Sequence, residues 1–262
     1  MHDFYASSRP VPLDQADGLR RMFAGRRRVV LPLAANPYVP FSGVVLDRLA
    51  AVLAAPGRQV LVVDAAAASP PPHELAALDL GVCVEHLSPR VAYLAARGLP
   101  MAYVDTRGCA GSFLDALTRA APQAEVVVLH ADAQDLVRVF KRRAARPVLL
   151  GADHPDSIKH AYAGAKLLAG RCSLMTFDLL LAAPPQSPRV AAIAQSLSGC
   201  AETFLGALLL HTAVIDPAGD PGEPPDAALA SLLAAQLALD EDARALCAPA
   251  ASSATPARTV FR

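Results

Sequence analysis

A polar segment near the N-terminus carries the side chains best suited to act on a partner molecule. Residues 14–21 read Asp-Gln-Ala-Asp-Gly-Leu-Arg-Arg. The amide of Gln15 can orient a water molecule, and the guanidinium groups of Arg20 and Arg21 can each pair with a carboxylate or a phosphate through two hydrogen bonds. Asp14 is a good N-cap for a helix over about 14–24. The alternative is an ordinary capped surface helix, because short motifs recur by chance.

The loop after the first expected strand is where an α/β fold would hold a phosphate, since ligands bind at the carboxyl ends of parallel strands. It reads Pro-Leu-Ala-Ala-Asn-Pro-Tyr-Val-Pro-Phe-Ser-Gly over 32–43. A phosphate cradle needs consecutive backbone N–H groups, glycines and a lysine. Pro37 and Pro40 have no N–H, and no lysine or arginine lies between Leu31 and Asp47. A triphosphate would find too few donors here; the alternative is an unrelated loop that never bound one.

Three polar residues end apolar runs that we expect to be strands. Asp64 and Asp105 could be metal or nucleotide ligands, but without a phosphate cradle the capping of loops is favoured. His130 could act as a general base. No motif places a nucleophile beside His130, so a structural histidine is favoured. The chain has no Gly-x-Ser-x-Gly elbow, which argues against a serine hydrolase.

One pattern could contribute to a metal site. Asp156 and His160 are four residues apart on an expected helix, and His154 is near. A surface contact between the two is favoured. The five cysteines are widely spaced, with no Cys-x-x-Cys pair, as expected for reduced cytosolic thiols. We therefore expect no metal and no other cofactor.

Small basic clusters occur at Arg26–Arg28 and at Lys141–Arg143 with Arg146. They could contact nucleic acid or an acidic partner, but solvated helix ends are favoured. The 24 basic and 24 acidic residues give a net charge of zero, which provides no general attraction to nucleic acid or to an anionic membrane. We expect no nucleic-acid partner.

Strand and helix signals alternate along the chain and predict an α/β fold, a mostly parallel sheet with helices on both faces. Expected strands begin at 29 and continue at 60–64, 101–105, 126–130, 147–151, about 174–181 and about 207–214. Expected helices cover 42–55, 84–97, 112–121, 133–144, 156–169 and 189–203, with a last helical pair over 227–247.

The length of 262 residues, 53% of them hydrophobic, allows one large domain or two small ones. We expect an arm over 1–27, an α/β domain over 28–216, and a linker with short C-terminal helices and a disordered tail over 217–262. No apolar run approaches the roughly 20 residues that span a bilayer, and the first residues lack the pattern of a signal peptide. These features favour a cytoplasmic protein.

Three segments resemble the MinD-like regulators of flagellar number and placement, of the FlhG/FleN type. Residues 57–65 are similar to the strand that follows the family's phosphate-loop helix, and 153–168 resemble its Asp-Glu-Pro-Thr-Ser-Ile-Thr-Asp-Ala-Tyr segment. The resemblance covers roughly 14–216 and implies a MinD-like P-loop NTPase fold. The family's N-terminal Asp-Gln-Ala-x-x-Leu-Arg activator element corresponds here to Asp14, Gln15, Ala16, Leu19, Arg20 and Arg21.

The chain departs from that family at the nucleotide site. In an ungapped alignment the family's first lysine falls at Pro37, its phosphate-loop lysine at Ser42 and the following threonine at Gly43. In that family, one strand ends in an aspartate on the magnesium side of the nucleotide site, and the corresponding strand here ends at His130. Asp64 is interpreted as a remnant of the family's magnesium-binding chemistry. The chain thus resembles a pseudo-ATPase with a degenerate phosphate loop. The family's C-terminal membrane helix has no counterpart, since 249–262 has no apolar face, so we expect no stable membrane anchoring. Loss of ATP binding should also remove ATP-driven dimerisation.

The resemblance implies that residues 14–21 stimulate the signal-recognition-type GTPase that places the flagellum. Such a GTPase needs its attacking water oriented and its transition-state charge balanced. Flagellar transcriptional regulators and basal-body components are further candidate partners. The predicted function is therefore that of a non-catalytic regulator of flagellar biosynthesis. The alternatives are an active MinD/ParA-type ATPase with an unorthodox nucleotide site and a structural scaffold without activator activity.

Overall fold

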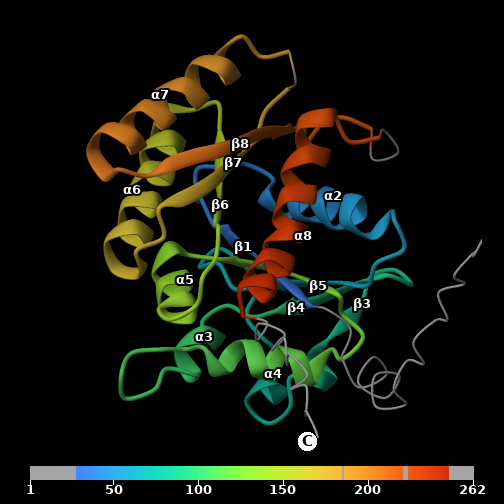
Figure 1. Ribbon diagram of the computed structural model, residues 1–262. Coiled ribbons are helices and arrows are strands. Elements are labelled where there is room, and N and C mark those ends of the chain that lie inside the picture. Colours follow the sequence, from blue (N-terminus) through green and yellow to red (C-terminus); the bar gives the residue numbers. More distant parts are fainter. Residues whose placement is uncertain (1–27, 185, 221–223, 248–262) are drawn as a thin grey trace, which may run out of the picture.

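The computed structural model describes residues 28–184, 186–220 and 224–247, and their strands form one eight-stranded sheet (Figure 1). The strands are β1 (Val29–Ala34), β2 (Val60–Asp64), β3 (Glu85–His86), β4 (Val91–Ala95), β5 (Val126–Ala131), β6 (Val148–Ala152), β7 (Thr176–Ala182) and β8 (Leu208–Ile215). The helices are α2 (Ser42–Ala54), α3 (Leu99–Ala102), α4 (Ser112–Ala120), α5 (Ala133–Phe140), α6 (Pro155–Cys172), α7 (Arg189–Leu205) and α8 (Ala227–Cys247), with 3₁₀ turns η1 (Glu74–Ala77) and η2 (Gly81–Cys83).

The strand order is β3-β4-β2-β5-β1-β6-β7-β8, and every pairing is parallel except that of the short β3 with β4. Parallel strands covered on both faces need apolar residues at successive positions. Strand β5 meets this need, since Val126 and Val128 face one hydrophobic core while Val127 and Leu129 face the other. The predicted mostly parallel α/β fold is confirmed.

Helices cover both faces of the sheet. Helices α4, α5, α6 and α7 contribute buried residues such as Phe113, Leu136 and Leu197 to the first core. Helices α2 and α8, which lie together in front of the strands in Figure 1, contribute Leu49 and Leu232 to the second. Within the described ranges, no helix has both the length and the apolar composition to cross a bilayer.

Two predicted elements are wrong. The segment 84–97 is not a helix, because it contains β3 and β4, and β4 pairs along its whole length with β2. Its alanines and leucines favour a helix locally, but the parallel pairing with a buried strand prevails. The segment 101–105 is not a strand; it includes the end of α3, which follows Gly98 in a left-handed conformation and has a proline in its first turn.

The C-terminal helical pair is also wrong, since 227–247 forms the single helix α8. No glycine or proline interrupts this alanine- and leucine-rich stretch, so nothing breaks the helix. Leu229 and Leu233 of α8 are buried in the second core. The helix therefore shares the core of the sheet.

Candidate functional site at the carboxyl ends of the strands

Hydrogen bonds of the Asn36 side chain anchor the loop between β1 and α2 to the rest of the protein. Its buried amide Nδ2 donates to the carbonyl of Leu150 and to that of Ser157, both at 2.8 Å, and its Oδ1 accepts from the backbone N–H of Tyr38 at 3.1 Å. The hydroxyl of Ser157 in turn accepts from the N–H of Ala152 at 2.9 Å. The polar groups of Asn36 are therefore engaged with the protein's own backbone and are not directed to a ligand.

The loop ends at Phe41, an aromatic residue with a strained backbone conformation. Phe41 is the N-cap of α2, has φ 56° and makes no side-chain capping bond. A left-handed conformation is unfavourable for a bulky residue. Phe41 is 74% exposed, and the Tyr38 ring is half-exposed against the ring of His160, at a centroid distance of 5.9 Å. The loop thus presents aromatic rings where a phosphate cradle would present amides.

The three residues aligned with the family's phosphate loop lie in this same segment. Pro37 is in the turn that Asn36 begins, in which the N–H of Val39 donates to the carbonyl of Asn36 at 3.1 Å. Ser42 and Gly43 begin α2. A Cβ atom at Gly43 would meet nothing within 4 Å, so packing does not require glycine there.

Asp64 and His130 form a buried pair at the ends of β2 and β5. His130 Nδ1 lies 2.7 Å from Asp64 Oδ1, because the register of the two strands places these residues side by side. Ser69 donates its hydroxyl to the same carboxylate oxygen, and the Tyr93 hydroxyl donates to the other at 3.3 Å. Among the described residues, His130 Nε2 is buried and has no hydrogen-bond partner.

This group does not have the geometry of a catalytic triad. The Ser69 hydroxyl donates to the carboxylate instead of to His130, so the imidazole does not activate it. Sequence reasoning singled out Asp64 and His130 but missed Ser69 and Tyr93. A tyrosine in the middle of β4 could have been noticed only if 91–95 had been recognised as a strand next to β2.

The hydrogen bonds of the cluster control the protonation of its members. Burial alone would raise the pKa of Asp64, but hydrogen bonds from His130 and Ser69 outweigh it and leave that pKa below its ordinary value. Burial and the neighbouring charge of Asp64 raise the pKa of Tyr93 to about 12. Asp64 is therefore ionised and Tyr93 protonated at neutral pH, as the hydrogen bond between them requires.

We expect Asp64→Asn to flatten the acid limb of the stability curve. Because the pKa of Asp64 is depressed in the folded state, its contribution is full above the unfolded value of about 3.9. That contribution is lost as the pH falls from there through the folded pKa. Thermal unfolding from neutral pH down to about 2 measures this. The control is Asp47→Asn on the exposed side of α2; an unchanged acid limb in Asp64→Asn would contradict the assignment.

The other acidic and histidine candidates have separate roles. Asp105 is not at a strand end; its Oδ1 closes a turn by accepting from the N–H groups of Arg107 and Cys109 at 2.9 and 2.8 Å. His154 is the N-cap of α6, and Asp156 pairs with Lys159 at 3.0 Å. No group of three metal-ligating side chains forms within the part of the chain that the structure describes.

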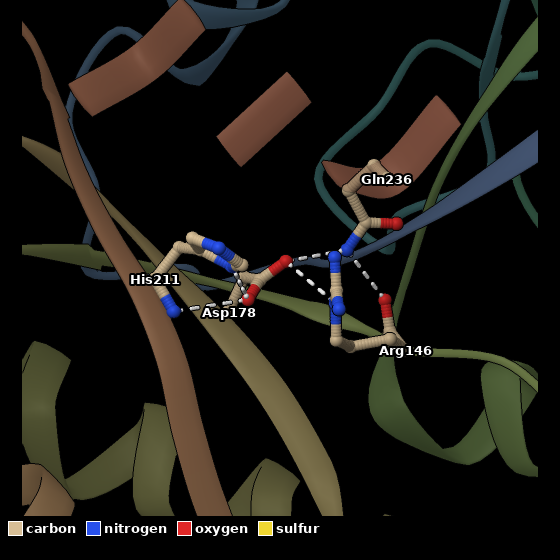
Figure 2. Close-up of polar contacts among 4 residues, drawn as sticks. All are labelled: Arg146, Asp178, His211 and Gln236. Carbon is tan, nitrogen blue, oxygen red and sulfur yellow. Dashed lines mark hydrogen bonds and ion pairs between the residues drawn. The ribbon is translucent and has the colours of Figure 1, made fainter. Parts of the chain in front are cut away.

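Several described members of the basic clusters have partners within the protein. Arg28 donates to the carbonyls of Ala124 and Ala121 at 2.9 and 2.8 Å, beyond the end of α4. Lys141 donates to the carbonyl of Arg107 at 2.9 Å. Arg146 is buried in an ion pair with Asp178 (Figure 2). The proposed activator residues 14–21, with Arg26 and Arg27, lie outside the described residues.

Comparison with known proteins gives structural similarity only. No protein-family model matches the chain, and no curated protein sequence matches it significantly. A plasmid partition protein from Borrelia burgdorferi superposes with a TM-score of 0.55 at 8% identity, over 80% of this chain and 99% of that one. A second Borrelia burgdorferi structure, described as a plasmid partition protein bound to AMPPNP, gives the same score and identity over 79% and 97%.

A chain of the MinC:MinD cell division protein complex from Aquifex aeolicus superposes with a TM-score of 0.51 at 13% identity, over 89% of this chain and all of that one. These similarities span nearly the full length of each solved chain. At such low identity they establish architecture and not activity. The chain therefore has the mostly parallel α/β fold of the MinD/ParA-type P-loop ATPases.

Proposed function

We propose that this chain is a non-catalytic regulator that uses a MinD/ParA-type fold to bind partner proteins. The observation that supports this is the loop between β1 and α2. It lies at the position where this fold holds phosphate, but it contains two prolines and no cation, and Asn36 is bonded to backbone carbonyls of the protein itself. A nucleoside triphosphate carries about four negative charges at neutral pH and needs hydrogen-bond donors and a cation to balance them.

The partner that the sequence suggests is the signal-recognition-type GTPase that places the flagellum. Residues 14–21 resemble the activator element of the MinD-like flagellar regulators. In this proposal Asp14 caps a helix, Gln15 orients the attacking water, and Arg20 and Arg21 pair with carboxylates or phosphates of the GTPase. Flagellar transcriptional regulators and basal-body components are further candidate partners of the α/β body.

Nucleotide binding distinguishes this proposal from a functioning ATPase. Isothermal titration of the full chain with ATP and Mg²⁺ is expected to give no saturable heat up to about 1 mM, a concentration that corresponds to only about −4 kcal/mol of binding free energy. The partition protein solved with AMPPNP is the positive control. Micromolar affinity would contradict the pseudo-ATPase assignment and support an unorthodox nucleotide site.

A binding experiment tests the partner. The immobilised full chain is expected to retain the purified flagellar GTPase, and a chain lacking residues 1–24 is expected to lose it. The deletion ends before β1, so it removes no residue of the described elements, and circular dichroism of the variant checks that it is folded. Equal retention by both chains would favour the scaffold alternative, in which the α/β body acts without the arm.

A further inference from the structure

Strand β8 is the last strand of the sheet, and within the described residues nothing pairs with its outer edge. Its sequence, Leu-Leu-Leu-His-Thr-Ala-Val-Ile, contains no lysine, acidic residue or proline. Natural proteins usually protect an edge strand with such residues, because the unpaired N–H and C=O groups would otherwise recruit another strand. This eight-residue edge is therefore open to pairing.

Exposed apolar side chains gather at the start of this strand. They are Met175, Phe204, Leu208 and Leu210, with exposures between 39% for Met175 and 73% for Phe204. The N–H of Leu208 donates to the carbonyl of Met175 at 2.8 Å, and the chain turns at Gly206, which has φ 63° and lies against the Met175 methyl group. Exposed apolar side chains close together in this way are typical of an interaction surface.

A buried polar network holds this patch in place. Phe177 pairs with Leu209 and Asp178 with His211, so Leu210 is an extra residue that bulges from β8. Asp178 Oδ1 accepts from both the backbone N–H and the ring Nδ1 of His211, at 3.1 and 2.9 Å. Figure 2 shows Asp178 between His211 on one side and Arg146 on the other. The bulge is thus fixed by hydrogen bonds, and Leu210 stays exposed.

The charges near the two ends of the strand are mostly of opposite sign, with exposed Glu202 among the cations at its start. Near its start, Arg171 is exposed, and residues 172–176 line a hollow of about 380 Å³ together with Lys141–Arg143. Beyond its end the chain carries Asp216, Asp220 and Asp226, together with Arg48 of α2, which donates to the carbonyls of Asp216 and Gly219. If a second β8 lies antiparallel to the first, the basic end of each copy meets the acidic end of the other. A parallel arrangement would instead bring like charges together.

We propose that the outer edge of β8 pairs antiparallel with β8 of a second copy of this chain and forms a two-fold symmetric dimer. Such an interface is isologous, so every favourable contact occurs twice. Leu208 and Leu210 of each copy are covered by the second half of the partner strand, and the charge complementarity selects the antiparallel orientation. This edge does not include the loop between β1 and α2, so the proposal does not depend on nucleotide binding.

Sedimentation velocity of the full chain tests the dimer. The unmodified chain is expected to sediment as a dimer at about 100 µM and to dissociate on dilution, as a small interface implies. The double variant Leu208→Lys, Leu210→Lys is expected to be monomeric at that concentration. Leu78→Lys is the control, because Leu78 is 85% exposed and lies after η1, away from the edge. A monomeric unmodified chain, or a dimer that survives the double variant, would overturn the proposal.

Charge reversal tests the orientation. Arg171→Asp and Asp216→Arg, the latter directly after β8, are each expected to weaken the dimer by roughly tenfold, and the combined variant is expected to recover most of the loss. Recovery supports the antiparallel arrangement, and additive weakening overturns it.

Hydrogen exchange of the unmodified chain tests the strand pairing without any variant. The amides of β8 should be protected more at high than at low protein concentration, and equal protection would contradict strand pairing.

Discussion

Replacing Asp178 by alanine is expected to lower the free energy of unfolding by about 3–5 kcal/mol, the usual cost of leaving one member of a buried ion pair without its partner. Asp178 is fully buried and accepts from Arg146 Nε at 2.9 Å and from Gln236 Nε2 at 2.7 Å. The variant leaves both donors and the N–H of His211 without their acceptor. Arg146 Nη2 is already without a partner among the described residues, so its charge would be poorly compensated. Denaturant unfolding measures the loss.

The matched control for Asp178 is an exposed pair of the same types. Asp115 lies 3.4 Å from Arg143, and both side chains are about half-exposed. Asp115→Ala is expected to change the free energy of unfolding by less than about 1 kcal/mol, as is usual for a surface ion pair. If Asp178→Ala cost no more than this control, the network of Figure 2 would not anchor the sheet.

Replacing Gln15 by alanine in the full chain is expected to remove most of the stimulation of the flagellar GTPase. Residues supplied in trans accelerate other GTPases by about 10³–10⁵-fold. Under our proposal Gln15 orients the attacking water, so its loss should lower the turnover at saturation, whereas Arg20→Ala and Arg21→Ala should mainly raise the concentration needed for half-maximal stimulation. Single-turnover GTP hydrolysis at increasing concentrations of the chain separates these effects.

The control for Gln15 is Ser8→Ala in the same arm, which is expected to stimulate like the unmodified chain. An unmodified chain that does not accelerate hydrolysis at saturation would end the activator proposal. Stimulation that survives Gln15→Ala would show that another group orients the water.

The fold was largely predictable because its strands are continuous apolar runs. The runs that form β2, β5, β6 and β7 could be read directly. Strand β4 could not, because the alanines and leucine of its Val-Ala-Tyr-Leu-Ala sequence favour a helix locally, and its strand conformation depends on pairing with β2. The segment 101–105, which contains the end of α3, was mistaken for a strand instead.

The site was predictable in its residues but not in their contacts. Asp64 and His130 were each singled out as strand ends, and nothing in the chain indicated that β2 and β5 are adjacent and in register. The prolines of the loop after β1 were informative, whereas the left-handed conformation of Phe41 was not foreseeable. The sequence did contain an indication of the role of Asp178 that was not used. A carboxylate inside the apolar run of β7 must find buried donors.

The hydrogen bonds of Gln236 have a consequence for how the protein is made. Gln236 of α8 donates to the carbonyl of Arg146 and to Asp178, so a residue of the last described helix completes the polar contacts of strands synthesised earlier. While the ribosome is still translating, that face of the sheet lacks its last helix. The nascent domain is therefore expected to stay incomplete until α8 emerges from the exit tunnel, and we expect chains truncated before Gln236 to be less stable and more readily cleaved by proteases.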